Sequence, residues 1–147
     1  IKRAVHIDLN SVRFCDRELL EKLGRIDLIQ DYVKEHLVQA ETWGGETADS
    51  PFDWPLVTNI EMFQAYVNSY LKQRSDVHQE GFDIRARQLA PGPHGLPLEV
   101  LAFSTTTVGA DYEATQEEII DHMLAAMPYF GLRVYQQPTD HPALGTR

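Results

Sequence analysis

Few side chains in this 147-residue sequence stand where they could do chemistry together. His6 and Asp8 are two residues apart in the stretch RAVHIDL, whose alternating apolar residues predict a half-buried strand with both side chains on one face. Such a pair can hold a metal ion or orient an imidazole, but a catalytic zinc site needs about three protein ligands. Spacing identifies no third ligand. A solvated polar face is therefore favoured, and a hydrolase using His6 and Asp8 is the weakest functional hypothesis.

Cys15 follows this strand and precedes a helix start, a position where a thiolate can be stabilised. As the only cysteine it can form neither an internal disulfide nor a zinc ribbon, which favours a reducing compartment. No other histidine stands beside a recognisable nucleophile and orienting group: these are His36, His78, His94, His122 and His141. The sequence thus predicts a non-enzymatic protein with no catalytic residue, cofactor-binding residue or metal ligand.

Two groups of charged residues have structural explanations. Glu117, Glu118 and Asp121 are expected in the first turns of a helix, where the macrodipole favours negative charge. Arg85 and Arg87 share one face of a predicted strand and can hold an anion or a neighbouring chain's carboxylate. For the two arginines, a solvated strand face is the favoured alternative.

Composition narrows the classes of function. A hydrophobic content of 43% in 147 residues predicts one compact domain with a sizeable core. The net charge of −9 and the scattered Lys and Arg residues argue against nucleic-acid binding, and no basic amphipathic helix favours a membrane surface. No segment approaches the roughly 18 apolar residues of a membrane span. Because the sequence starts at Ile1 rather than Met, we expect a piece of a longer protein.

The first half of the chain predicts a strand, a pair of helices and a loop. The strand pattern of RAVHIDL is interrupted at Asn10 and resumes in VRF, and helical spacing then runs from Asp16 to Leu37 with a break at Gly24. Residues 42–57 form the predicted loop insertion, rich in Gly, Pro, Asp and Ser. Its aromatic residues, Trp43, Phe52 and Trp54, favour a loop that packs back onto the domain over a flexible insertion.

The second half predicts two helices and three strands. Thr58 with Glu61, and Thr115 with Glu118, match the capping box that opens a helix. The first helix should end near Ser75 and the second at Pro128 and Gly131. Residues 83–89 and 98–105 are predicted strands, and LRVYQQP is the last short strand.

The stretch RQLAPGPHGLPLEVLAFSTTT, residues 87–107, is either a phosphate-gripping glycine loop or a turn between strands. A phosphate loop needs a helix N-terminus after it and free backbone N–H groups. Here a strand follows, and Pro91, Pro93 and Pro97 lack those N–H groups. The stretch therefore predicts a stiff hairpin connection, with Gly92 and Gly95 available for turn conformations.

The order of these elements matches a ferredoxin-like, split β-α-β domain of the α+β class. We expect a mainly antiparallel sheet with helices on one face and a single domain over residues 1–147. Edge strands of such a sheet are candidate contacts between subunits.

Three stretches carry a family resemblance: TNIEMFQAYVNSYLKQ, RARQLAPGPHGLPLEVLAFSTTT and EIIDHMLAAMPYFGLRVYQQPT. Together they resemble the C-terminal cytoplasmic domain of bacterial small-conductance mechanosensitive channels, most closely the miniconductance branch. IKRAVHIDLNSVRFCD is similar to the strand region after that family's β-rich middle domain. The resemblance spans Ile1 to about Thr139, and the long segment from Arg17 to Leu56 suits the miniconductance branch.

The resemblance implies a parent protein of the bacterial inner membrane, with pore-forming membrane helices upstream and this domain on the cytoplasmic side. In the family, the soluble parts of seven subunits form a vestibule with side portals, and the channel relieves osmotic pressure. It implies self-association as a heptamer, no cofactor and no catalytic residue. We further expect rings of carboxylates to enrich cations near the openings. The alternative is a soluble ferredoxin-like regulatory domain that binds a small metabolite between subunits through Arg85, Arg87 and the hairpin.

Overall fold

The computed structural model describes residues 1–43 and 57–138, without the side chains of residues 40–43. The main elements are β1 (Lys2–Ile7), α1 (Arg17–Leu23), α2 (Gln30–Trp43), α3 (Asn59–Gln73), β2 (Arg85–Gln88), β3 (Leu96–Leu101) and α4 (Gly109–Ala126). Short 3-10 helices occupy Leu9–Ser11, Asp27–Ile29 and Met127–Phe130. The helices and antiparallel strands make this an α+β fold, as predicted.

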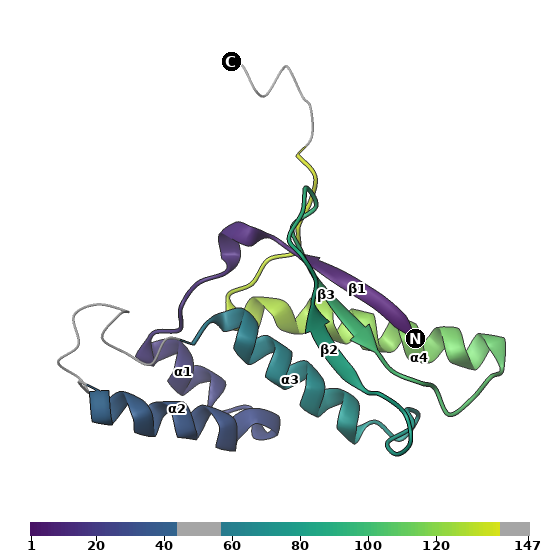
Figure 1. Cartoon of the computed structure of the whole chain (residues 1–147), viewed down its shortest axis with the longest axis horizontal. Helices are drawn as coiled ribbons and strands as arrows, with labels where there is room; N and C mark the ends of the chain where they lie inside the picture. The colour runs from purple at the N-terminus through teal and green to yellow at the C-terminus, as the bar shows by residue number, and fades with distance from the viewer. Residues whose placement is uncertain (44–56, 139–147) are drawn as a thin grey trace.

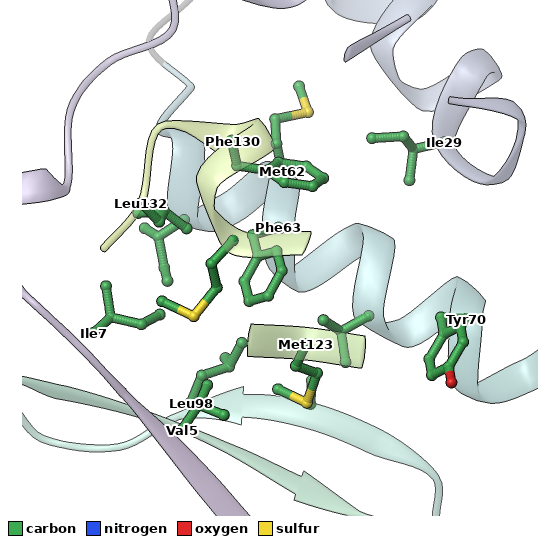
Figure 2. Packing of buried hydrophobic residues seen from close by; sticks show 14 of the residues in the cluster. Val5, Ile7, Ile29, Met62, Phe63, Tyr70, Leu98, Met123, Phe130 and Leu132 are labelled. Carbon is green, nitrogen blue, oxygen red and sulfur yellow. The ribbon is translucent and has the colours of Figure 1, made fainter. Parts of the chain in front are cut away.

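The three strands form one antiparallel sheet in the order β1-β3-β2. Val5 pairs with Leu98 and Ala86 with Val100, so the buried side chains of all three strands share one face. Helices α3 and α4 cover that face, whereas α1 and α2 lie to one side of the sheet (Figure 1). Figure 2 shows strand residues meeting Phe63 of α3 and Met123 of α4 in a common core.

The predicted last strand, LRVYQQP, is reduced to a single bridge between Val134 and Ile7. Two backbone hydrogen bonds flank this bridge. The Tyr135 N–H donates to the His6 carbonyl, and the Asp8 N–H donates to the Arg133 carbonyl. On the Arg133 side the pairing cannot continue because β1 ends at Ile7, where the chain turns into the 3-10 helix Leu9–Ser11. The same turn makes the predicted continuation VRF wrong, and only Phe14 bridges, to Thr58.

The outer edge of β2 is occupied at its centre by side chains of α3. The Ala86 N–H donates to Asn68 Oδ1 at 2.8 Å, and Gln64 Nε2 donates to the Ala86 carbonyl at 3.0 Å. Gln88 Nε2 also donates to Gln64 Oε1. Two amide side chains therefore take the hydrogen bonds that a further strand would form at Ala86, which argues against this edge as a backbone contact between subunits.

Local capping signals specify most helix ends. The Asp16 carboxylate accepts from the Leu19 N–H at the start of α1, and Gly24 caps its end. Thr58 caps α3 by accepting from the Glu61 N–H, although the Glu61 carboxylate accepts from the Tyr32 hydroxyl rather than completing the capping box. The helix predicted to open at Thr115 instead begins at Gly109, with Val108 as its cap.

The segment between β2 and β3 is a hairpin, as predicted. Gly92 and Gly95 exchange two backbone hydrogen bonds across the tip, of 3.0 and 3.1 Å. Gly95 has φ of 85°, and a Cβ there would lie 2.4 Å from the Ile7 carbonyl oxygen. Glycine is thus required at Gly95 by both backbone conformation and space. Strand β3 begins at Leu96 and ends at Leu101, earlier at both ends than the predicted 98–105.

Asn59, at the start of α3, forms a fully buried junction between three parts of the chain. Its side-chain oxygen accepts from the Arg13 N–H, and its Nδ2 donates to the carbonyls of Ser11 and Phe130, all at 2.9–3.0 Å. The amide nitrogen therefore donates two hydrogen bonds, and the amide oxygen accepts one of the two that it can accept. This asparagine fixes the N-terminal end of α3.

Most of the predicted loop 42–57, with Phe52 and Trp54, lies outside the described residues, and so does the Trp43 side chain. The described part of the chain contains no helix of the length and apolarity that a membrane crossing requires.

Candidate functional site

A group of ionisable side chains joined by hydrogen bonds lies between α3 and α4, and we call it the α3–α4 polar cluster. Tyr66 and Tyr70 are four residues apart on one side of α3, and Arg74, four residues further on, is the C-cap of that helix. The other members come from α4 and from the loop after α3. The cluster is made of Tyr66, Tyr70, Arg74, Asp76, Thr115 and His122.

His122 of α4 packs on two tyrosines of α3. Its ring stacks on Tyr70 with centroids 3.9 Å apart and planes within 6°, and its Nε2 lies 2.6 Å from the Tyr66 hydroxyl oxygen. The Tyr66 ring is also nearly parallel to the imidazole, at 5.8 Å. Figure 2 shows Tyr70 at the margin of the hydrophobic core, away from Phe63 and Met123. The cluster thus borders the core rather than filling it.

Arg74 links α3 to the loop that follows it. Its Nε and Nη2 donate to the two oxygens of Asp76 at 2.8 and 2.6 Å, and its Nη1 donates to the Tyr70 hydroxyl at 2.7 Å. The Thr115 hydroxyl of α4 donates to Asp76 at 3.2 Å, and Glu118 lies 3.7 Å from Arg74. The bidentate pair therefore connects two helices through one loop residue.

The surroundings shift the pKa values of these groups in directions that geometry explains. Hydrogen bonds from Arg74 hold the pKa of Asp76 below its usual value and raise that of Arg74 itself. Partial burial, and secondarily the Arg74 charge, lowers the pKa of His122. Burial raises the pKa of Tyr66. Near neutral pH the cluster therefore has an ionised Arg74–Asp76 pair beside a neutral imidazole.

The cluster has the groups for proton transfer but no nucleophile for covalent chemistry. The Thr115 hydroxyl is bonded to Asp76, and the imidazole meets a phenol rather than a serine, threonine or cysteine. A shallow hollow of about 290 Å³ adjoins Tyr66, and its other lining residues are apolar or aromatic: Ile26, Ala125, Ala126, Tyr129 and Phe130. This arrangement joins two helices and lacks converging polar groups around a substrate-sized space.

A larger open hollow of about 600 Å³ lies at the end of the sheet near Ile1. The rings of His78 and Phe82 stack at 4.6 Å, and Phe82 contacts Phe103 at 4.9 Å. Phe82 and Phe103 are 48% and 39% exposed, so this is a surface aromatic patch. Its remaining lining comprises Tyr112, Ser104, Thr106 and Thr107. Sequence analysis gave no sign of this patch.

His6 and Asp8 do not form the pair that their spacing predicts. His6 is exposed on β1, whereas Asp8 lies beyond the strand, caps the following 3-10 helix and pairs with Arg133 at 3.0 Å. A hydrogen bond from the Asn10 N–H, and secondarily the hydrogen bond from Arg133, lower the pKa of Asp8. Among the described residues, no group of three or more His, Cys, Asp and Glu side chains is arranged to hold a metal ion.

Cys15 does not have the environment of a reactive thiol. The side chain is buried, and desolvation raises its pKa to about 12, so the thiolate is scarcely populated at neutral pH. The position of Cys15 before a helix, where a thiolate can be stabilised, does not have that effect here because the side chain is buried in the core.

Arg85 and Arg87 share a face opposite buried Ala86, as predicted, but each is paired within the chain. Arg85 lies 3.3 Å from Asp83, and Arg87 lies 2.9 Å from Glu99 on β3. The Arg87–Glu99 pair is the shorter of the two and the better shielded from water, because Glu99 is only 8% exposed. An anion bound here would have to compete with these carboxylates.

The acidic run of α4 is not at the helix start. Because α4 begins at Gly109, Glu117, Glu118 and Asp121 lie in its middle turns, and the macrodipole does not explain their charge. All three are exposed. The other histidines stay apart from this region: His36 contacts Tyr32, His78 contacts Phe82, His94 faces Tyr135, and His141 lies outside the described residues.

A sequence signal for the cluster is the four-residue spacing of Tyr66, Tyr70 and Arg74, which indicates a shared side of the helix but identifies no partner for it. The contributions of Asp76 and Thr115 had no such signal. In comparisons with known proteins, the chain matches no protein-family model. No solved structure matches it either.

Proposed function

We propose that this chain is the cytoplasmic vestibule domain of a mechanosensitive ion channel similar to the miniconductance branch of the small-conductance family. In this role the domain is non-catalytic: it supports subunit assembly and shapes the access of ions to a pore formed elsewhere in the protein. The proposal includes a ring of seven copies on the cytoplasmic side of the bacterial inner membrane. It originates in the sequence resemblance.

The observation that carries the proposal is the way in which the three resembling stretches fold together. The first coincides with α3 and its cap Thr58, the second with the β2–β3 hairpin, and the third with the second half of α4 and the bridge at Val134. Their buried side chains belong to a single hydrophobic core. The resemblance is therefore carried by one packed unit, as expected for a scaffold domain.

We also propose that the fold is ferredoxin-like. The sheet order β1-β3-β2, with the Val134 segment bridged to the outer side of β1, supports the strand order 4-1-3-2 of that arrangement. The helices α3 and α4 occupy the two crossover positions between these strands.

The alternative, a metabolite-binding regulatory domain, has less support. Its expected contacts, Arg85 and Arg87, are engaged by Asp83 and Glu99. A thermal-shift screen of the isolated chain against small anionic metabolites tests this alternative, which predicts a rise in Tm that Arg85→Gln and Arg87→Gln abolish.

The main proposal is tested with the complete gene product in bacterial cells that lack their own mechanosensitive channels. We expect tension-activated currents in patches of the cell membrane and improved survival of a sudden drop in external osmolarity. Gly95→Val, which places a branched side chain against the Ile7 carbonyl, should reduce the amount of assembled channel, whereas Gly92→Val should not. Absence of any tension-activated current from a correctly inserted gene product would refute the proposal.

A further inference from the structure

The contact between α3 and α4 at His122 depends on an ionisable ring in a confined position. The imidazole stacks on Tyr70 at 3.9 Å, and its Nε2 is 2.6 Å from the Tyr66 hydroxyl. The ring is half-buried, so it exchanges part of its hydration for these two contacts. Either tautomer of the neutral imidazole can form the bond to Tyr66, as donor or as acceptor.

The charged groups around this ring do not favour a second positive charge. From α3, the Arg74 guanidinium is bonded to the hydroxyl of Tyr70, the same residue whose face carries the imidazole. From the loop, Asp76 is already engaged by two bonds from Arg74. From α4, Glu118 lies toward Arg74 with its side chain 67% exposed, and Asp121 is exposed.

A proton on His122 would therefore create a half-buried cation near an existing one. Among the described residues, His122 has no ion pair with a carboxylate that would offset its desolvation. Attraction of the cation to the Tyr70 face opposes this cost but is weak at partly exposed sites. Turning the imidazole out to water would relieve the cost, and that movement would release Tyr66 and Tyr70 together.

We propose that His122 is a proton-sensitive latch between α3 and α4, closed when the imidazole is neutral and opened when it takes up a proton. Phe63 and Met123 beneath the latch are fully buried and have side chains that do not titrate, so this packing holds the helices in register in both states. Opening therefore loosens the outer part of the helix pair without unfolding the domain. The inference concerns this chain alone and does not depend on the channel proposal.

The direction of the pH response follows from the lowered pKa of His122. The unfolded chain protonates His122 near the ordinary histidine pKa of 6.5, whereas the folded chain resists protonation. The unfolded state therefore binds more protons as the pH falls below that value. The stabilisation is fully present above pH 6.5 and is lost progressively down to the folded pKa. Acidification from neutral pH therefore weakens the α3–α4 contact.

The experiment is a pH titration of the full 147-residue chain by NMR, following the imidazole resonances of each histidine and the backbone amides of α3 and α4. We expect the His122 resonance, assigned from its absence in His122→Gln, to titrate below the value of a free histidine. The amides of Tyr66 and Tyr70 should shift with the same midpoint. Titration of His122 without a concerted change at these tyrosines would overturn the latch.

Two variants separate the latch from a general effect of acid. Arg74→Gln removes the neighbouring cation and should move the His122 midpoint upward; an unchanged or lower midpoint contradicts the assigned surroundings.

In denaturant unfolding between pH 7 and pH 5, the unfolding equilibrium constant should rise several-fold more in the wild type than in His122→Gln. The matched control is His36→Gln, which removes a half-buried helical histidine that contacts Tyr32 on its own helix only. It should keep the wild-type response, and identical profiles for the wild type and His122→Gln would refute the proposal.

Discussion

The two ends of α3 are both anchored by polar side chains, but by different kinds. At the N-terminal end, the fully buried Asn59 makes its bonds with neutral backbone groups of Arg13, Ser11 and Phe130. At the C-terminal end, Arg74 makes its bonds with a carboxylate and a phenol, and both Arg74 and Asp76 remain partly exposed. One anchor is an amide junction and the other an ion pair.

This difference shows how a small domain can combine a permanent contact with an adjustable one. The Asn59 amide does not ionise, so its bonds persist at any pH at which the backbone is folded. The α3–α4 polar cluster contains acid, base and phenol, so its strength depends on pH and salt. We therefore expect the N-terminal end of α3 to determine whether the domain folds, and the C-terminal end to determine how firmly α4 is held.

The largest expected effect is at the amide junction. Asn59→Ala leaves the Arg13 N–H and the carbonyls of Ser11 and Phe130 without partners in a buried site, which should lower the free energy of unfolding by about 3 kcal/mol. Urea unfolding monitored by circular dichroism measures this loss. The control is Asn10→Ala at an exposed asparagine, expected to lie within about 0.5 kcal/mol of the wild type. If Asn59→Ala lowers the free energy of unfolding no more than Asn10→Ala does, the buried amide does not anchor the N-terminal end of α3.

Breaking the ion pair should cost less. Arg74→Met keeps the stem of a side chain that is 14% exposed but removes its bonds to Asp76 and Tyr70, which should lower the free energy of unfolding by about 2 kcal/mol. Its control is Arg85→Met, which breaks a pair exposed by about half on both sides and should change stability by roughly 0.5 kcal/mol or less. Equal losses for the two arginines would show that the cluster is no more than a surface pair.

The cap of α3 offers a smaller test of its N-terminal end. Thr58→Ala removes the side-chain acceptor of the Glu61 N–H and should destabilise the domain by about 1 kcal/mol. Thr58→Ser retains the hydroxyl and should recover most of that loss. The same urea unfolding assay, run with both variants at pH 7, compares the cap with the buried amide one residue later.

The smallest expected effect is the acid response of Asp76. Hydrogen bonds from Arg74 lower the folded pKa of Asp76 below its ordinary value of 3.8, so its stabilisation is present above that pH and is lost as the pH falls through the folded pKa. Unfolding measured from pH 5 to pH 2.5 should therefore show a steeper loss in the wild type than in Asp76→Asn. Asp8, whose pKa is also lowered, contributes equally to both proteins and cancels in this difference. Parallel slopes would mean that the ion pair does not contribute to stability.

The sequence predicted the elements whose signals are local. Asp16, Gly24 and Thr58 act through backbone groups within four residues, and the structure confirms all three helix ends. The same type of motif failed at Thr115, which lies inside α4 and whose hydroxyl donates to Asp76, 39 residues away. The motif alone does not tell whether the hydroxyl caps a helix or bonds to a distant residue.

The candidate site was largely beyond prediction for the same reason. His122 is half-buried, and its partner Tyr66 lies 56 residues earlier in the sequence. Helical spacing places Tyr66 and Tyr70 on one face of α3 without indicating that a histidine will stack there. Long-range pairing of this kind depends on how the helices cross the sheet, and a single sequence does not encode that in any local pattern.

The amide side chains along β2 also limit how copies of this chain can meet. A β-strand approaching that flank would have to displace Asn68 and Gln64 from the peptide group of Ala86 before gaining any hydrogen bond of its own. Growth of a continuous intermolecular sheet, the first step toward fibrils, is thereby blocked at the middle of this strand. Even at high local concentration, neighbours along this flank would recognise each other through side chains and remain separable.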